Sequence, residues 1–146
     1  MRSVRRTVVA IGSIAMVLVG SASASAAIKI KEIEFNPPGP DTGTNAHLNE
    51  EYVMFTNTGG TTVMLNRWTV RDADGNVFRF GPDDRIPAHT DLMIHTGRGS
   101  EALLHKYWGL RRYLWDNGGD RATLRRADGS VADRCRYSGS GSTVAC

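Results

Sequence analysis

The chain has 146 residues, with 18 Lys and Arg against 15 Asp and Glu, and this length suits one domain rather than two. Three basic residues, Arg2, Arg5 and Arg6, lie in the first 26 residues, which contain no acid, so the rest of the chain holds 15 basic and 15 acidic residues. This balance argues against a generally basic protein of the nucleic-acid-binding class.

Residues 1–26 have the three parts of a secretory signal peptide. A cationic start at 1–6 precedes an apolar run at 7–20, and small residues follow, including the cleavage signal Ala24-Ser25-Ala26. The apolar run is shorter than the roughly 20 residues of a transmembrane helix. We expect cleavage near Ala26 and a secreted protein, extracellular or associated with the cell envelope, with no membrane span in the mature chain.

The first half of the mature chain shows strand patterns separated by turn residues. Residues 28–35 alternate apolar and charged side chains, which predicts a half-buried strand. The Pro and Gly residues between 36 and 49 predict a long surface loop without a helix. Residues 51–56 and 61–65 are rich in β-branched and aromatic side chains, and we expect them to pair as a hairpin.

Asp-Gly pairs mark two further hairpins, because glycine tolerates the positive φ of tight turns. Residues 68–72 and 77–80 flank the first pair, and residues 122–125 and 131–135 flank the second. A further strand is predicted at 91–95, and the one helical candidate is residues 100–107, with Ser100 as its cap. Seven to nine short strands with almost no helix predict an all-β fold, an antiparallel β-sandwich.

The two cysteines, Cys135 and Cys146, are predicted to form a disulfide, because an exported chain folds in an oxidising compartment. The bridge would staple the Gly- and Ser-rich tail at 138–146 to the last strand. In the chain-entropy model such a short loop contributes about 2–3 kcal/mol. We interpret both cysteines as structural, since two thiols alone do not make a zinc site.

Six segments follow one another in a recognisable order and spacing: residues 50–59, 65–70, 86–88, 95–97, 115–120 and 124–129. In this order and spacing they resemble the lamin tail domain. The resemblance covers residues 27–137 and implies an immunoglobulin-like β-sandwich that acts as an interaction module without catalytic residues. In bacteria such domains are known from exported proteins. The C-terminal cysteine pair departs from the family pattern.

Motifs for catalysis or for a cofactor are lacking in the sequence. It has no Gly-x-Ser-x-Gly elbow and no phosphate-binding loop. Adjacent Glu50 and Glu51 would point to opposite faces of a strand, and residues 72–76 fit a hairpin turn better than a calcium loop. A metal site needs three or four convergent ligands, so we expect no metal. Each histidine is expected to be solvated or singly hydrogen-bonded: His47, His89, His95 and His105.

An aromatic and basic segment supplies the candidate binding surface. Trp108 and Tyr113, beside Arg111 and Arg112, are expected at the surface, where they can anchor a protein or stack on a sugar ring. We expect the other two tryptophans in the core: Trp68 and Trp115.

Residues 98–146 carry nine basic and five acidic residues. Their arginines would form a phosphate-contacting surface only if strand alternation brought them to one face, so nucleic acid is not an expected partner. These arginines are Arg111, Arg112, Arg121, Arg125, Arg126, Arg134 and Arg136.

Together these features predict a secreted, non-catalytic binding or scaffolding module with an unidentified protein partner. Its contacts are expected in the loop at 36–49 and in the segment at 97–116. The first alternative is a module that binds cell-wall polysaccharide through Trp108 and Tyr113. The second is an accessory module or a small hydrolase or nuclease, which the lack of a catalytic motif makes the weakest hypothesis.

Overall fold

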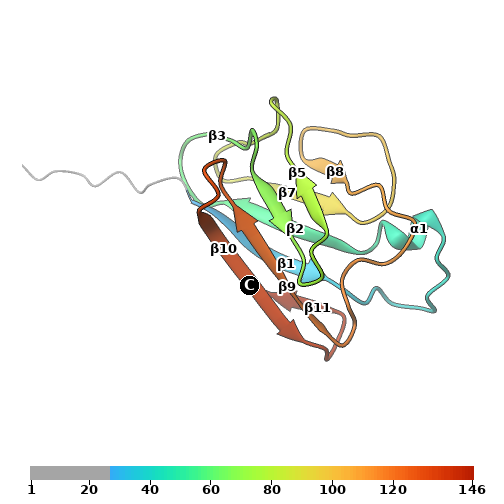
Figure 1. The fold of residues 1–146 in the computed structure, drawn as a ribbon. Coiled ribbons are helices and arrows are strands. Elements are labelled where there is room, and N and C mark those ends of the chain that lie inside the picture. Colours follow the sequence, from blue (N-terminus) through green and yellow to red (C-terminus); the bar gives the residue numbers. More distant parts are fainter. Residues whose placement is uncertain (1–26) are drawn as a thin grey trace, which may run out of the picture.

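The computed structural model describes residues 27–146, so the predicted signal peptide lies outside the described residues (Figure 1). The described chain contains eleven strands and one short helix, α1 (Asn45–Leu48). The strands of the first half are β1 (Ile28–Glu34), β2 (Tyr52–Asn57), β3 (Val63–Met64), β4 (Thr69–Arg71), β5 (Val77–Arg79) and β6 (Arg85–Ile86). Those of the second half are β7 (Asp91–His95), β8 (His105–Tyr107), β9 (Gly119–Arg125), β10 (Val131–Ser138) and β11 (Thr143–Ala145).

Two sheets form the layers of a sandwich, which confirms the predicted fold class. The five-stranded sheet has the order β11-β1-β2-β7-β8, and the four-stranded sheet has the order β10-β9-β4-β5. β3 and β6 form a separate two-stranded ladder. Adjacent strands are antiparallel except for β7 and β8, which are parallel.

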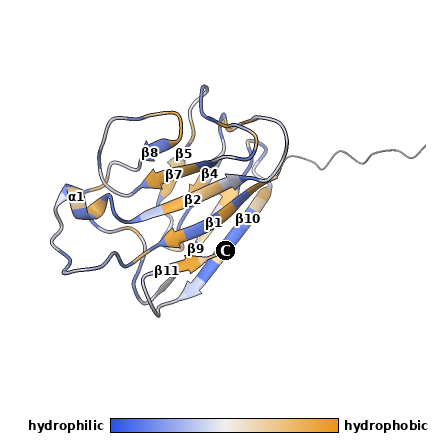
Figure 2. Cartoon of the chain, turned by 180° about the vertical axis from the view of Figure 1, so that it is seen from behind, coloured by the Kyte–Doolittle hydropathy of each residue, from blue (hydrophilic) through white to orange (hydrophobic). Residues whose placement is uncertain are grey.

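The core lies between the two sheets and follows from the two-residue period of the strands. Within β2, Val53 and Phe55 are fully buried, whereas Tyr52, Met54 and Thr56 are only partly buried. Figure 2 shows hydrophobic stretches along β2 and β7. The largest fully buried side chains come from both sheets and from the connecting segments: Trp115, Phe35, Phe55, Phe80, Leu65, Leu92 and Leu124.

Both Asp-Gly hairpins are confirmed. β4 pairs with β5, and β9 pairs with β10, in antiparallel ladders. The turn residues Gly75 and Gly129 have φ values of +96° and +84°. Because a side chain is strained at such φ values, glycine is the residue that lets these strands reverse within a few residues.

The hairpin expected between residues 51–56 and 61–65 is wrong. β2 pairs with β1 and β7, while β3 pairs with β6. The reason is visible at Asn57, the buried last residue of β2. Its side-chain amide donates to the carbonyls of Thr61, Ile86 and Pro87, at 2.8, 3.0 and 3.1 Å, and thereby ties the next segment to β6 instead of to the β2 ladder.

The helix expected at residues 100–107 is also wrong. Residues 105–107 form strand β8, which pairs with β7 at the edge of the five-stranded sheet. The buried Lys106 ammonium lies 2.5 Å from the Asp84 carboxylate and 3.2 Å from Glu101, and these contacts hold the segment in an extended conformation.

The single helix instead lies inside the loop at 36–49, where none was expected. Thr44 caps α1, because its side-chain oxygen accepts a hydrogen bond from the backbone N–H of His47 at 3.3 Å. Two of the four residues of α1, His47 and Leu48, are buried. Tertiary burial therefore stabilises a helix that is too short to form alone.

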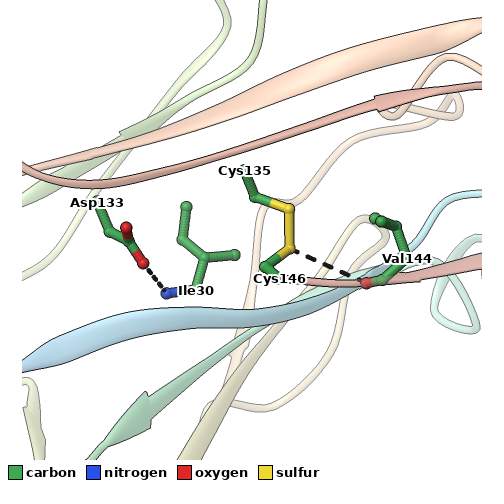
Figure 3. Close-up of a disulfide and its surroundings, with 5 residues drawn as sticks. All are labelled: Ile30, Asp133, Cys135, Val144 and Cys146. Atoms are coloured by element: carbon green, nitrogen blue, oxygen red, sulfur yellow. Dashed lines mark hydrogen bonds between the residues drawn. A yellow bond between two sulfur atoms is a disulfide. The ribbon is translucent and has the colours of Figure 1, made fainter.

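The C-terminal tail is joined to the sandwich in two ways. The predicted disulfide between Cys135 and Cys146 is present, with a Cα–Cα distance of 5.7 Å (Figure 3). Residues 143–145 form β11, a strand that the sequence did not predict, and pair with residues 32–34 of β1. Beside the disulfide, the Ile30 N–H donates to the Asp133 carboxylate at 2.9 Å, which connects β1 to β10 (Figure 3).

Candidate functional site

The four residues expected to form a binding surface lie on the segment between β8 and β9. Trp108 is half-buried, and its ring lies 5.7 Å from that of Phe78 and 6.1 Å from that of Trp115. Tyr113 is half-buried as well, with its hydroxyl 2.5 Å from Nδ1 of His47. Both aromatic rings therefore already have partners within the protein.

Arg111 and Arg112 are exposed on the same segment. The Arg112 guanidinium donates to the side-chain oxygen of Asn76 at 2.9 Å. A shallow hollow beside it is lined by three carboxylates as well, those of Asp41, Asp74 and Asp116. The positive charge of this surface is thus partly offset by its surroundings.

The two tryptophans expected in the core are buried to different degrees. Trp115 is 1% exposed and belongs to the core. Trp68 is partly buried against the core, and the Arg126 guanidinium lies 5.8 Å from the centre of its ring, within the range of a cation–π contact.

A buried carboxylate, which the sequence analysis considered only as a rejected pair with Glu50, holds the aromatic segment in place. Glu51 has no exposed surface, and its Oε1 accepts hydrogen bonds from the Thr96 hydroxyl at 2.6 Å and from the Leu114 N–H at 2.7 Å. Its Oε2 has no partner among the described residues. Burial raises the pKa of Glu51 to about 7, although the hydrogen bonds act in the opposite direction. These hydrogen bonds tie Glu51, which precedes β2, to Thr96 and to the segment at 114–115.

The outer face of the four-stranded sheet carries a second, larger group of arginines. The ladder register places Arg121 opposite Arg136, and Thr123 lies between Arg71 and Arg134. In the next row Thr69 lies between Arg79 and Arg125. All six guanidinium-bearing side chains are exposed. We call this surface the arginine face: Arg71, Arg79, Arg121, Arg125, Arg134 and Arg136.

The spacing of the arginine face follows from sheet geometry. Neighbouring strands are about 4.8 Å apart, and outward-facing residues along one strand are about 6.7 Å apart. Within residues 27–146, no Asp or Glu forms a salt bridge with any of the six arginines. The nearby carboxylates of Asp72 and Asp120 are buried, and they accept hydrogen bonds from the backbone N–H groups of Asn76 and Ala73.

Two hollows adjoin this surface. One, of about 250 Å³, is lined by Arg71, Arg121 and Arg125, and also by Asp72. The other, of about 320 Å³, is lined by Arg121 and Arg136, and also by Asp120. Anionic groups that enter either hollow would meet guanidinium groups from two neighbouring strands.

The structure brings together four of the seven arginines that the sequence analysis considered, and it adds two from the first half of the chain. Within each strand, the alternation of arginine with inward-facing residues indicated that the arginines point outward. The sequence did not indicate the order of the strands, which decides whether these arginines share one surface. The residues that lie elsewhere are Arg111, Arg112 and Arg126.

His95 makes two hydrogen bonds through its ring nitrogens, where at most one was expected. His95 lies beside His105, with 3.1 Å between Nε2 of the first and Nδ1 of the second. No group of three or more His, Cys, Asp and Glu side chains converges within the described part of the chain. In residues 27–146 no helix is long and apolar enough to cross a membrane.

Comparison with known proteins agrees with this architecture. A family model described as Lamin Tail Domain matches residues 21–139, which include every strand from β1 to β10. No curated protein matches the chain. The strand β11 and Cys146, which close the C-terminal staple, lie outside the matched range. Since the match covers most of the sequence and the sandwich is present, the chain belongs to the lamin tail domain family.

Proposed function

We propose that this protein is a secreted, non-catalytic binding module whose arginine face docks onto an acidic surface of a protein partner. Lamin tail domains are immunoglobulin-like interaction domains, which supports a role in protein binding rather than in catalysis. The observation that carries the proposal is the register that places six exposed arginines from four strands on one face.

The chemistry of arginine favours a carboxylate-rich partner. Each guanidinium presents a planar fork of N–H donors that matches the two oxygens of a carboxylate. Because the six side chains have no internal salt bridges within residues 27–146, binding does not require an existing ion pair to break. The rigid sheet beneath them fixes the positions from which the side chains project, which lowers the entropic cost of binding.

Secretion is part of the proposal and is supported by the sequence of residues 1–26. The disulfide between Cys135 and Cys146 is consistent with it, because such bonds persist in oxidising compartments outside the cytosol.

The surface around Trp108 and Tyr113 receives less support as the main contact. Both rings are half-buried and packed against other side chains, whereas stacking on a sugar requires an open ring face. The arginine face is therefore our leading candidate over a polysaccharide site.

The test compares two double variants that remove the same charge from different surfaces. Arg121→Gln/Arg136→Gln alters the arginine face, and Arg111→Gln/Arg112→Gln is the matched control. The probe is a poly-glutamate peptide, with a DNA duplex of equal charge in a parallel titration at several salt concentrations. We expect the first variant to weaken peptide binding about tenfold, with a strong salt dependence, and the control to change it far less.

Equal weakening by both variants would show that only net charge matters and would overturn the proposal. Binding of the duplex without binding of the peptide would also overturn it, because the face would then serve a nucleic acid instead of an acidic protein.

A further inference from the structure

Two histidines and two methionines gather on the outer face of the five-stranded sheet, opposite to the arginine face. The register aligns Met54, Met93 and His105 in one row across β2, β7 and β8. His95 lies in the adjacent row, between Tyr52 and Tyr107. Met54, Met93 and His105 also line one hollow of about 160 Å³.

The two imidazole rings point their nitrogens at each other. Nε2 of His95 and Nδ1 of His105 are 3.1 Å apart, the ring centres are 5.4 Å apart, and the ring planes differ by 11°. The distance between the ring centres exceeds the distance between the two nitrogens by about the width of one ring. Because the ring planes are also nearly parallel, the two rings must lie edge to edge and nearly in one plane. The two ring nitrogens therefore face each other within the ring planes.

The tautomer of His95 is set by the backbone. Its Nδ1 lies 2.7 Å from the carbonyl oxygen of Asn49, which can only accept a hydrogen bond, so Nδ1 carries the proton. Nε2 of neutral His95 is then unprotonated and directed at His105. A ligating histidine that donates its other N–H to a backbone carbonyl is the usual second-shell arrangement in metal sites.

His95 is half-buried and held in place by the hydrogen bond to the Asn49 carbonyl. His105 is exposed, so it can carry its own proton on the outer nitrogen and offer Nδ1 to a metal.

The neighbouring groups discriminate between metals. Thioether sulfur is a soft ligand that selects copper(I), whereas calcium and magnesium require oxygen ligands. The carboxylate nearest to the hollow, that of Asp91, is bound by the Lys31 ammonium at 2.5 Å. Since no third His, Cys, Asp or Glu converges there among the described residues, the ligand set of a structural zinc site is not formed.

We propose that His95 and His105 form a linear binding site for one copper(I) ion, beside the thioether side chain of Met93 in the row of His105. In this site the metal replaces the hydrogen bond between the two imidazoles. Imidazole nitrogens bind such ions at about 2.0 Å, so a linear arrangement needs the nitrogens about 4 Å apart. His105, on the exposed edge strand, would move outward by about 1 Å to reach that distance. In the neutral imidazole of His105 the proton moves from Nδ1 to the outer nitrogen, so it stays on the ring.

The experiment titrates the mature protein, residues 27–146, with copper(I) in the absence of oxygen, against a chromophoric copper(I) chelator. Ascorbate keeps the metal reduced, and a thiol assay confirms that the disulfide remains intact and contributes no ligand. We compare the wild type with His105→Ala and Met93→Leu. The matched controls are His89→Asn, because Asn tolerates the positive φ of this residue, and Met64→Leu, whose side chain is exposed.

We expect one copper(I) per chain, about a tenfold or greater loss of affinity in His105→Ala, a smaller loss in Met93→Leu, and no change in either control. The imidazole nitrogen resonances of His95 and His105 are expected to shift on binding, and thermal unfolding of His105→Ala verifies that the variant is folded. Unchanged affinity in a folded His105→Ala protein would overturn the site. Equal or tighter binding of zinc(II) by the same pair would overturn the assignment to copper(I).

Discussion

Replacing Glu51 by Gln is expected to remove a large part of the dependence of stability on pH. Glu51 is fully buried, and its Oε1 accepts from Thr96, Leu114 and Trp115. Burial raises its pKa from the ordinary value of 4.5 to about 7. The folded protein therefore binds the proton more tightly than the unfolded chain does, and the carboxylate form is the less stable one.

The sign and size of the effect follow from this difference. The stabilisation by the bound proton is complete below pH 4.5 and is lost as the pH rises through about 7. At about 1.4 kcal/mol for each pH unit, the loss in free energy of unfolding amounts to about 3 kcal/mol. For a domain of this size that corresponds to a fall in Tm of about 10 °C.

Gln keeps the oxygen that accepts the three hydrogen bonds and has no proton to lose. We therefore compare the Tm of Glu51→Gln minus the Tm of the wild type at two pH values. This difference is expected to be about 10 °C more positive at about pH 8 than at about pH 5. The measurement is thermal unfolding followed by circular dichroism. The matched control is Glu50→Gln, because Glu50 is the exposed neighbour in sequence.

Comparing differences between two proteins cancels the contributions of other titrating groups. Asp120, whose pKa is raised by burial, acts in the same direction as Glu51, and His95, whose pKa is lowered, acts in the opposite direction. If the Tm difference between the wild type and Glu51→Gln is the same at both pH values, the buried carboxylate does not titrate as argued and the reasoning is refuted.

Two further predictions concern long-range contacts, beside the tests of the arginine face and of the copper site. Cys135→Ser/Cys146→Ser is expected to lower the free energy of unfolding in urea by about 3 kcal/mol and to increase amide hydrogen exchange in β11. An unchanged urea midpoint would show that the pairing of β11 with β1 alone holds the tail. Asn57→Ala is expected to cost about 3 kcal/mol in the same assay, because three carbonyl partners lose their donor, whereas the exposed Asn66→Ala should change little. Equal effects of these two substitutions would contradict the role given to Asn57.

Local sequence signals account for most of the correct predictions. The alternation in residues 28–34 predicts β1, and the Asp-Gly turns predict the β4–β5 and β9–β10 hairpins, since each depends only on neighbours along the chain. The disulfide was predictable because the chain has only two cysteines. The number of strands was underestimated, since β6, β8 and β11 have two or three residues each.

The errors arose where distant contacts override local preference. The apolar spacing at 100–107 resembles a helix, but pairing with β7 and the ion pairs of Lys106 stabilise a strand there. Parallel pairing of this kind leaves no turn signal in the sequence. In the same way, the three hydrogen bonds of Asn57 direct the following segment to β6, and nothing in residues 51–65 alone indicates that partner.

For the functional surfaces, too, some features follow from the local sequence and others only from the tertiary structure. The sequence by itself determined which arginines share one side of each strand, because side chains alternate with a period of two. Only the tertiary structure decided that β10, β9, β4 and β5 are neighbours, which joins those arginines into one face. The burial of Glu51 and the meeting of His95 with His105 likewise depend on segments far apart in the sequence. Periodicity is a local property of the chain, whereas strand order and burial arise from the packing of the whole domain.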